Sequence, residues 1–594
     1  MRNAMIYVAM GWALLSCSEE ASILPVGRPA QGYVKLTLCL PEGASLTTKS
    51  ANEQFESGRA EEYAVHNGLI AYFQAPIGAS EAEATFVEAQ PLDLSPWNVA
   101  QAQQNVTTRQ TLVAQAPVPE KETQLYALVL LNRNQLVTLT EEGMLLVGER
   151  PVERLSDLQQ AEEAALSDWI GEEANSFFMA SAPVADRPAE RGAFRPQVSQ
   201  LTPVTTYRDL PTAETPAERL FVERAVAKVE VAVSGQRTIL DDGTVTMPVE
   251  GQRNHRLRLL GWRLEHTNRT AKPVRDVSGY ADWATYSNAG AKTALNRFFG
   301  TEPDPYRIYW AVDGNYGDAP ADDEAMQRYV AQQFHTITAD EAAWLPMYRD
   351  TESSTAYCLE NTCPASEMRP ELLTSIVVET EYQLPEGETN AAGDLFTMGG
   401  STAVYGVSRL EETVNQLLHR SGAKAYQFVR GTEPEGAVIR TAADYARYFA
   451  TAAGEPMSEA DAWTLIDSPF VETIYFYRGG KSYYHTWPIQ HFGDYYTPVG
   501  EGESYSESAH LGRYGVVRNQ WYVVYIEGVT SPGYPVLPQP KPDPDPGVDP
   551  DPDPGWNPDP TPIPTPDPSP DTGYGLRTTI HVRPWTVRYQ EVEF

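Results

Sequence analysis

Two groups of residues in the second half of the chain have the types that catalysis or metal binding would need. Gly479-Gly-Lys-Ser482 is similar to part of a phosphate-binding loop, but Tyr475 stands where that loop needs glycine, and the context predicts a hairpin. His485, His491 and Asp494 could bind a metal ion, but their aromatic neighbours indicate sheet packing. The signature motifs of serine hydrolases, zinc proteases and dinucleotide-binding folds are absent. We therefore predict no enzyme, no cofactor and no metal site.

The composition excludes two further classes of protein. The 594 residues include 45 Lys and Arg against 80 Asp and Glu, a formal charge of −35. Such an acidic chain lacks the clustered cations that phosphate contacts need, so we expect no nucleic-acid partner. No run of 18 apolar residues follows the N-terminus, which argues against an internal membrane span. With 42% hydrophobic residues, the chain is long enough for two to four globular domains.

The N-terminus carries a different kind of chemistry, in which a cysteine is acylated. Arg2 precedes a short apolar stretch over residues 5–15, which is typical of a signal peptide. Leu14-Leu15-Ser16-Cys17 resembles the bacterial lipobox, and Ser18-Glu19-Glu20 resembles the acidic tract that marks surface export of lipoproteins in Bacteroidetes. We predict lipidation at Cys17 and a precursor anchored in the outer membrane. The alternative is an ordinary signal peptide with an incidental cysteine.

The first strand is predicted directly after this leader. Residues 33–40 alternate cleanly and place four apolar side chains on one face: Val34, Leu36, Leu38 and Leu40. Such alternation is typical of a half-buried β-strand. A polar segment without apolar period follows over residues 41–61. The strand is therefore separated from the body of the protein.

The other end of the chain repeats this arrangement. Residues 535–570 comprise 36 residues, of which 16 are Pro and seven are Asp, a composition that favours an extended linker of about 110 Å. An alternating strand follows, with Ile580 and Val582 before Pro584, and then Trp585, Val587 and Tyr589 in shifted register. A lone strand is unstable and needs a sheet. It either folds back onto its own chain or completes the sheet of a neighbour.

Between these ends, the pattern predicts strands with some helices. Strands are expected at 69–73, 126–131, 221–233 and within 514–525, and a hairpin at 475–484. A helix is expected from Ser156 through Trp169, and others at 322–335, 408–420 and 441–453. A stretch rich in Pro and Thr at about 202–217 marks the predicted domain boundary.

The chain resembles the Bacteroidales fimbrillins, type V pilins, and among them the major subunits of short (Mfa-type) fimbriae. The resemblance covers nearly the full length and rests on the order and spacing of short motifs as well as on both terminal strands. These motifs are Asn175-Ser-Phe-Phe-Met-Ala-Ser181, Arg224-Ala-Val-Ala-Lys228, Gly261-Trp-Arg-Leu-Glu-His-Thr-Asn268, Arg307-Ile-Tyr-Trp-Ala-Val-Asp313, Tyr357-Cys-Leu-Glu-Asn-Thr362, His491-Phe-Gly-Asp494, Gly515-Val-Val-Arg-Asn519 and Val582-Arg-Pro-Trp-Thr-Val-Arg-Tyr589.

The resemblance implies a mainly β fold with two tandem transthyretin-like β-sandwich domains and helical insertions. We expect a signal peptide and lipobox at 1–17 and a propeptide with the removable strand at 18–59. The two domains are expected at 60–218 and 219–534, followed by the linker at 535–575 and the donor strand at 576–594. In this family a trypsin-like protease removes the first strand. The C-terminal strand of another subunit then fills the groove, and the subunits polymerise into a fimbria.

The position of the cut remains open between two basic residues of the polar segment. Arg59 is followed by Ala60, and arginine followed by alanine is the usual family pattern. Lys49 lies closer to the strand, as the cut does in the family. We favour Arg59.

Three functions are compatible with these features. The first is a structural subunit of the fimbrial shaft that supports adhesion, with other copies, accessory subunits and a surface protease as partners. The second is a tip or accessory adhesin, which would be expected to lack a donor strand. The third is a monomeric glycan-binding lipoprotein that uses aromatic residues 475–487. The terminal strand favours the shaft. Cys358 and Cys363 are close enough in sequence to pair, but two free buried thiols fit equally well.

Overall fold

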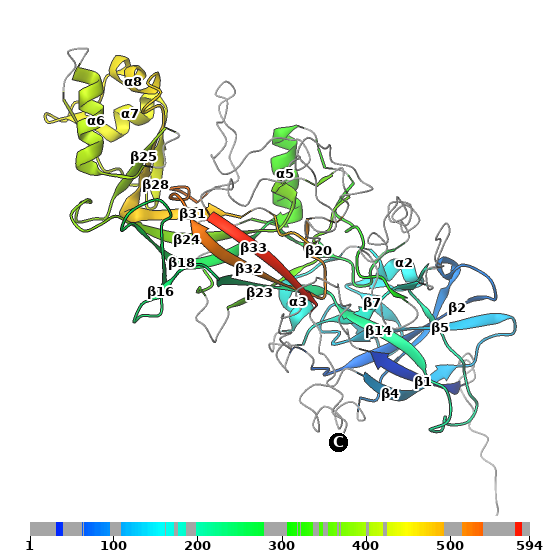
Figure 1. Cartoon of the computed structure of the whole chain (residues 1–594). Coiled ribbons are helices and arrows are strands. Elements are labelled where there is room, and N and C mark those ends of the chain that lie inside the picture. The colour runs from blue at the N-terminus through cyan, green and yellow to red at the C-terminus, as the bar shows by residue number, and fades with distance from the viewer. Residues whose placement is uncertain are drawn as a thin grey trace, which may run out of the picture.

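The fold is mainly β, as predicted, and its strands form several sheets. The structure is a computed structural model that describes residues 31–39, 62, 64–94, 109–160, 162–171, 176–185, 198–277, 306–317, 319–320, 322–336, 344–347, 354–364, 367–368, 370–399, 403–419, 425–486, 488–491, 512, 514–537 and 576–584. Figure 1 shows an N-terminal half, a C-terminal half and a lobe that projects from the C-terminal half.

The N-terminal half is built on a sheet of eight strands in the order β3-β2-β5-β10-β14-β1-β4, with β13 beside β5. Tyr72 of β2 donates a hydrogen bond to the carbonyl oxygen of Gln115 in β4 at 2.5 Å, so these two strands, which are not paired, face one another across the core. The strands are β1 (Gln31–Cys39), β2 (Gly68–Pro76), β3 (Thr85–Pro91), β4 (Arg109–Pro117), β5 (Thr123–Leu131), β10 (Met179–Ser181), β13 (Thr202–Pro203) and β14 (Glu218–Arg224).

Shorter elements surround this sheet. The prediction of one helix from Ser156 through Trp169 is wrong, because the chain forms two short helices there with a two-residue strand between them. Leu158 and Trp169 are nevertheless both buried in the N-terminal core. The short elements are η2 (Glu81–Glu83), β6 (Val137–Leu139), β7 (Leu145–Val147), β8 (Arg150–Pro151), α2 (Leu155–Leu158), β9 (Glu162–Glu163), α3 (Leu166–Ile170), β11 (Val184–Ala185) and β12 (Val198–Ser199).

The C-terminal half contains a four-stranded sheet, β23-β15-β32-β33, and a five-stranded sheet, β16-β17-β18-β24-β31. Their apolar faces contribute to a second core that includes Val229, Trp262 and Tyr522. The strands are β15 (Val226–Val233), β16 (Thr238–Ile239), β17 (Val245–Pro248), β18 (Arg256–Glu265), β23 (Thr355–Leu359), β24 (Ser375–Gln383), β31 (Lys481–His485), β32 (Gln520–Val529) and β33 (Leu576–Pro584).

Smaller elements lie between the two cores. Asp322 caps α5 by accepting a hydrogen bond from the backbone of Ala325 at 2.9 Å, as the predicted helix at 322–335 requires. The elements are β19 (Thr267–Asn268), β20 (Thr270–Ala271), β21 (Tyr306–Arg307), α5 (Asp323–Gln333), β22 (Phe334–His335) and η5 (Pro370–Leu372). β9 pairs with β20, and β11 with β21, so both halves contribute to these small sheets.

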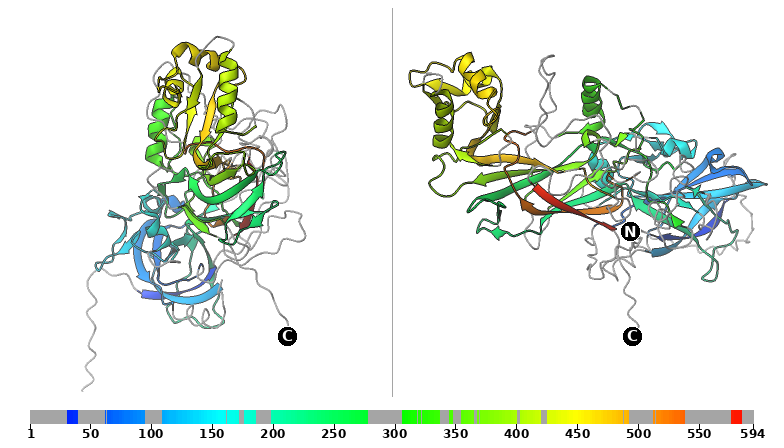
Figure 2. Two further views of the ribbon diagram at one scale, coloured as in Figure 1. Left: turned by 90° about the vertical axis from the view of Figure 1, so that its left-hand side faces the viewer. Right: turned by 45° about the horizontal axis from the view of Figure 1, so that its top comes forward.

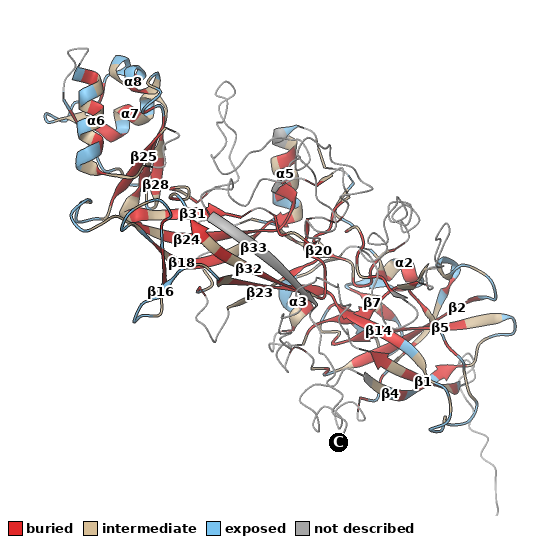
Figure 3. Ribbon diagram, in the orientation of Figure 1, coloured by how far each residue is buried: buried red, intermediate tan, exposed pale blue. Residues whose placement is uncertain are grey.

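The lobe is inserted between β24 and β31, and it stands at one end of the molecule in all views (Figures 1 and 2). Its three helices bury their apolar faces on a small sheet and expose their outer faces (Figure 3). The elements are β25 (Leu395–Met398), β26 (Tyr405–Gly406), α6 (Val407–His419), β27 (Tyr426–Phe428), β28 (Gly436–Ile439), α7 (Ala442–Tyr448), β29 (Phe449–Thr451), α8 (Glu459–Ile466), β30 (Ile474–Tyr477) and η6 (Arg478–Gly480).

Two predictions about strand connections are wrong in detail. The expected hairpin at 475–484 does not form, because β30 pairs with β25 and β28 while β31 pairs with β24. Gly479 and Gly480 have positive φ angles of 61° and 75° and turn the chain from one sheet into the other. The expected strand at 221–233 is interrupted at Ala225, where the chain passes from the N-terminal sheet (β14) into the C-terminal sheet (β15).

Candidate functional site

The first strand lies inside the N-terminal sheet. β1 pairs antiparallel with β4 along its whole length and parallel with β14 from Leu36 to Cys39. The side chains of Val34, Leu36 and Leu38 are fully buried, as their alternation predicts, and Leu40 falls outside the described residues. β1 is therefore an integral part of the core, although a polar segment separates it in sequence from the rest of the protein.

β1 also connects β4 to the rest of the sheet. Within the described residues, β4 pairs with no strand except β1, and it contributes Leu112, Ala114 and Ala116 to the core. Loss of β1 would expose these side chains and leave unpaired backbone groups on β14 and β4. Burial of each larger apolar side chain is worth about 1.5–3 kcal/mol, so an empty groove would bind a replacement strand strongly.

The outward face of β1 is held by the segment that precedes β14. Tyr33 and Tyr207 exchange two backbone hydrogen bonds of 2.8 Å. The ammonium of Lys35 donates to the carbonyl oxygens of Thr212, Ala213 and Thr215 at 2.7, 3.0 and 2.8 Å. The sequence shows only that Lys35 points away from the apolar face. Its acceptors are backbone atoms 177 to 180 residues away, for which side-chain types give no signal.

The last described strand folds onto its own chain. β33 pairs antiparallel with β32, from Gln520 opposite Pro584 to Val529 opposite Leu576. Among the described strands, β33 has β32 as its one neighbour and forms the edge of its sheet, in the half of the molecule away from β1 (Figure 1). The predicted residues Ile580 and Val582 lie in this strand, while Trp585, Val587 and Tyr589 fall outside the described residues.

A buried glutamate marks where the body resumes after the polar segment. The carboxylate of Glu62 accepts hydrogen bonds from Lys228 at 2.8 Å and from Tyr357 at 3.0 Å. Its carbonyl oxygen accepts two more, at 3.0 and 2.9 Å, from the guanidinium of Arg224. Cys17, Lys49 and Arg59 lie outside the described residues. Sequence reasoning missed the role of Glu62, since one glutamate in an acidic segment does not stand out.

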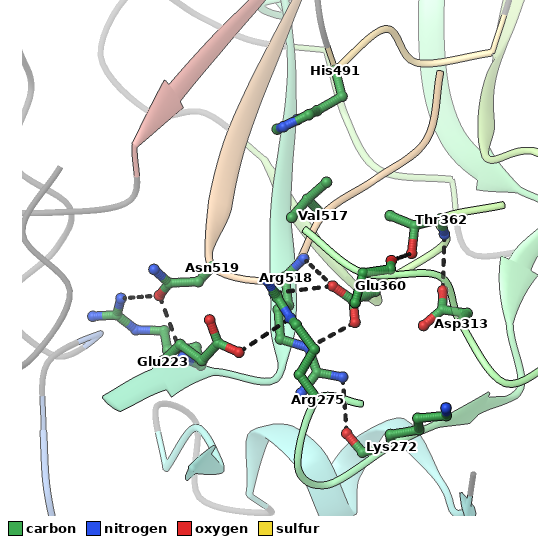
Figure 4. A network of polar contacts seen from close by, with 12 residues as sticks. Glu223, Lys272, Arg275, Asp313, Glu360, Thr362, His491, Val517, Arg518 and Asn519 are labelled. Carbon is green, nitrogen blue, oxygen red and sulfur yellow. Dashed lines mark hydrogen bonds and ion pairs between the residues drawn. The ribbon is translucent and has the colours of Figure 1, made fainter. Parts of the chain in front are cut away.

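Residues of three of the short motifs noted in the sequence meet in one buried polar network (Figure 4). Glu360 accepts a hydrogen bond from Arg518 at 2.9 Å and forms an ion pair of 3.2 Å with Arg275. Arg275 also pairs with Glu223 of β14 at 3.3 Å. Asp313 accepts from the backbone of Thr362 at 2.8 Å. The motifs therefore supply Asp313, Glu360 and Arg518 to this network, and Arg275 links it to Glu223 in the N-terminal sheet.

Opposing effects set the charge of these groups. Burial raises the pKa of Asp313, and the charge of Glu360 raises it further. Burial would also raise the pKa of Glu360, but the guanidinium groups of Arg518 and Arg275 outweigh it, so this pKa is lowered. Burial raises the pKa of Glu223 despite the nearby arginines. Such a network stabilises the junction only while its partners remain complete.

The residues considered for other chemistry do not converge. His485 lies 3.1 Å from Glu265, and His491 lies 2.8 Å from the hydroxyl of Tyr522; Asp494 is outside the described residues. Among the residues that the structure describes, no three side chains are arranged to hold a metal ion. Tyr483 and Tyr484 are buried, so they offer no exposed surface for stacking on sugars. Within the same residues, no helix is long and apolar enough to cross a bilayer.

No disulfide joins the cysteines of the described residues. Cys39, Cys358 and Cys363 are all buried and form no disulfide. The sequence left open whether Cys358 and Cys363 pair, and the structure places them as two separate thiols. Burial raises the pKa of the Cys358 thiol to about 12. Burial is also the main reason why the pKa of Cys363 is raised.

One family model matches the chain. Residues 475–591 match the family described as "Major fimbrial subunit protein type IV, Fimbrillin, C-terminal". This part of the chain is therefore similar to the C-terminal region of fimbrillins. The match includes β31, β32 and β33, and it confirms the resemblance to fimbrillins that the short motifs indicate.

Solved structures of fimbrial proteins also match, with low similarity. The tip fimbrial protein Mfa3 from Porphyromonas gingivalis, with C-terminal truncation, has 9% identity and a TM-score of 0.34 over 94% of this chain and 100% of that chain. A fimbrilin (fimA) from P. gingivalis W83 has 11% identity and a TM-score of 0.33 over 94% and 99% of the two chains. These scores carry no argument about function. No curated protein matches the sequence.

Proposed function

We propose that this protein is a structural subunit of the shaft of a surface fimbria and supports adhesion. It is exported as a lipoprotein acylated at Cys17 and reaches the outer surface of the outer membrane. A trypsin-like protease cuts after Arg59, with Lys49 as the alternative, and releases β1. The terminal strand of a second copy, or of an accessory subunit, then occupies the groove between β14 and β4.

The observation that carries this proposal is the position of β1. It is the first described strand in the chain, yet it lies between β4 and β14 and completes the core of the N-terminal half. The polar segment with both basic residues separates it from Glu62, whose four hydrogen bonds fasten the body. A cut in this segment therefore separates β1, which leaves, from Glu62, which anchors the rest of the protein.

The terminal strand supports the same mechanism. Val529 and Leu576 lie opposite each other, so a turn of two to five residues would suffice to connect β32 with β33. The chain instead places residues 530–575 there, including the Pro- and Asp-rich linker. Such a length is unnecessary for pairing within one molecule, and it allows the strand to reach a second one.

Exchange also increases the pairing of the terminal strand. Within the part of its own chain that the structure describes, β33 has one neighbour, β32, whereas the groove offers a neighbour on each side. β1 and β33 each comprise nine residues, and both sequences alternate. The long linker weakens pairing within the chain only slightly, because each doubling of loop length costs about 0.6 kcal/mol. Pairing on β32 thus keeps the strand protected until a groove opens.

The test is assembly before and after cleavage. Protein without residues 1–17 is treated with limited trypsin and compared with a variant that ends at Asp571, using gel filtration and negative-stain microscopy. N-terminal sequencing identifies the residue that is cut. Filaments are expected only after β1 is lost and only when residues 576–594 are present. If both proteins stay monomeric after loss of β1, the shaft function is wrong, and a tip or accessory role then leads.

A further inference from the structure

The three carbonyl oxygens around Lys35 form a site that can hold a cation. The acceptors belong to Thr212, Ala213 and Thr215, and all three lie within 3.0 Å of one ammonium group. Carbonyl oxygens accept hydrogen bonds and cannot donate them, so this group of three is satisfied by a side chain with several N–H donors. We call the three oxygens the carbonyl cradle.

The cradle is built by its own segment and not by β1. The backbone N–H of Thr215 donates to the carbonyl oxygen of Thr212 at 3.3 Å, and the N–H of Thr212 donates to the hydroxyl of Thr215 at 3.0 Å. The hydroxyl of Thr212 also donates to Glu214 at 2.7 Å. This hydrogen bond is the largest of the effects that lower the pKa of Glu214, and the charge of Lys35 is the smallest of them. When β1 leaves, the closed turn and the nearby carboxylate remain, but the cation is lost.

The terminal strand carries cations on one face. Its alternation places Leu576, Thr578, Ile580 and Val582 on one side and Arg577, Thr579, His581 and Arg583 on the other. If the first set faces the core in place of Val34, Leu36 and Leu38, the second set faces the cradle. The strand that enters the groove can therefore supply a cation where Lys35 was.

A second feature of the groove limits the register. A Cβ atom at Gly32 would lie 2.6 Å from Cγ2 of Thr206 and 2.8 Å from the carbonyl oxygen of Tyr207. To pair with both β4 and β14, an entering strand must run in the same direction as β1. Such a strand cannot place Leu576 or Thr578 at the position of Gly32 without moving the backbone. When Leu576 takes the place of Val34, the described strand starts beyond the crowded position.

In this register Arg577 takes the place of Lys35. Thr578 and Ile580 then replace Leu36 and Leu38, and Val582 follows at the position of Leu40. A shift by two residues toward Gly32 would bring Leu576 onto Gly32 and Thr579 to the cradle, which leaves the three oxygens without a cation. Steric fit and charge therefore favour the same register.

We propose that the carbonyl cradle is a cation-binding subsite of the groove, which Arg577 of a second copy occupies when its terminal strand replaces β1. The subsite fixes the register of the joint between subunits. This inference rests on the proposed strand exchange. A guanidinium has five N–H donors, enough for the three oxygens and the carboxylate of Glu214.

The test uses a free peptide of residues 571–594 as a competitor. Because the peptide brings a strand but no groove, it should stop the polymerisation of full-length protein that has been cleaved by limited trypsin. The inhibitory concentration is measured by light scattering for the natural peptide and for R577A, R577K and R583A. We expect R577A to need a roughly tenfold higher concentration, because it loses charge-assisted hydrogen bonds. R577K should stay close to the natural peptide. R583A, on the same face but beyond the end of β1, should match it.

The cradle itself is tested through Glu214. In cleaved Glu214→Gln protein, the advantage of the natural peptide over R577A should shrink, while inhibition by R577A itself should not change. Equal inhibition by the natural and R577A peptides would overturn the cation subsite and leave strand exchange intact. Polymerisation that none of the peptides inhibits would overturn the proposed exchange itself.

Discussion

The carboxylate of Glu62 and the ammonium of Lys228 lie 2.8 Å apart, and both side chains are almost completely buried. Lys228 belongs to β15, the first strand of the C-terminal sheet, and it also lies 4.1 Å from the ring of Trp521 in β32. Glu62 precedes β2 of the N-terminal sheet. The pair therefore fastens the start of the body to β15, the neighbour of the strand that pairs with β33, close to where the propeptide is predicted to end.

We expect Glu62→Gln to destabilise the folded protein by about 1.5–3 kcal/mol, because it removes the closer of the two carboxylates that neutralise a buried ammonium, the other being Glu230 at 3.4 Å. The free energy of unfolding in urea measures the effect, and the double variant Glu62→Gln, Lys228→Met should recover much of it. Glu412→Gln is the matched control, since Glu412 pairs with Arg409 at 3.6 Å on the exposed face of α6. Exposed pairs contribute little. Equal losses for both single variants would contradict a special role for Glu62.

A second prediction concerns the apolar face of β1. Leu36→Ala should lower the stability of the uncut protein by about 2–5 kcal/mol, because it leaves a cavity in the core. Thr37→Ala should cost less than about 1 kcal/mol, since Thr37 only shares an exposed hydrogen bond of 2.9 Å with Thr111. Heat dissociation of the finished polymer should be the same for both variants, because β1 has left by then. A polymer weakened by Leu36→Ala would show that β1 stays in place.

The buried carboxylates predict a dependence of stability on pH. The pKa of Asp313 is raised above its ordinary value of 3.8, so the folded state binds its proton more tightly, and stability falls as pH rises above that value. The pKa of Glu360 is lowered below 4.5, so its contribution is lost as pH falls through the lowered value. Asp313→Asn should remove only the fall at higher pH. Unfolding free energies from pH 3 to 8 test this, with exposed Asp241→Asn as the control. Curves of natural protein and Asp313→Asn that run parallel would contradict the prediction.

The sequence predicts the elements of this fold better than their partners. The alternation of residues 33–40 correctly gives β1 and its buried face, and the cap at Asp322 gives the start of α5. The hairpin at 475–484 fails because its two strands find better neighbours in separate sheets, β25 and β28 for one and β24 for the other. Local pattern determines whether a strand forms, but the partner depends on contacts across the whole chain.

The residues of the candidate site also divide into those that the sequence predicts and those that it does not. The burial of Val34, Leu36 and Leu38 follows from the two-residue period of the sequence alone. Glu62 and Lys35 could not be found, because the first depends on three partners distant in sequence and the second on backbone oxygens. The short motifs indicated a family, but the contacts between them become visible only in the structure, where Glu360 and Arg518 meet.

Cys39 offers a direct measurement of whether β1 leaves. In the uncut protein its side chain is 3% exposed and lies with Ala182 and Phe221, so it should resist maleimide, as should Cys358, whose pKa burial raises to about 12. After cleavage and assembly, the released peptide should carry one label at Cys39, while Cys358 and Cys363 stay unlabelled within the polymer. Mass spectrometry locates each label, and reductant should not change the mass of the native chain. Assembly without labelling of Cys39 would mean that β1 remains in its groove, and rapid labelling of Cys358 would mean that the C-terminal core opens instead.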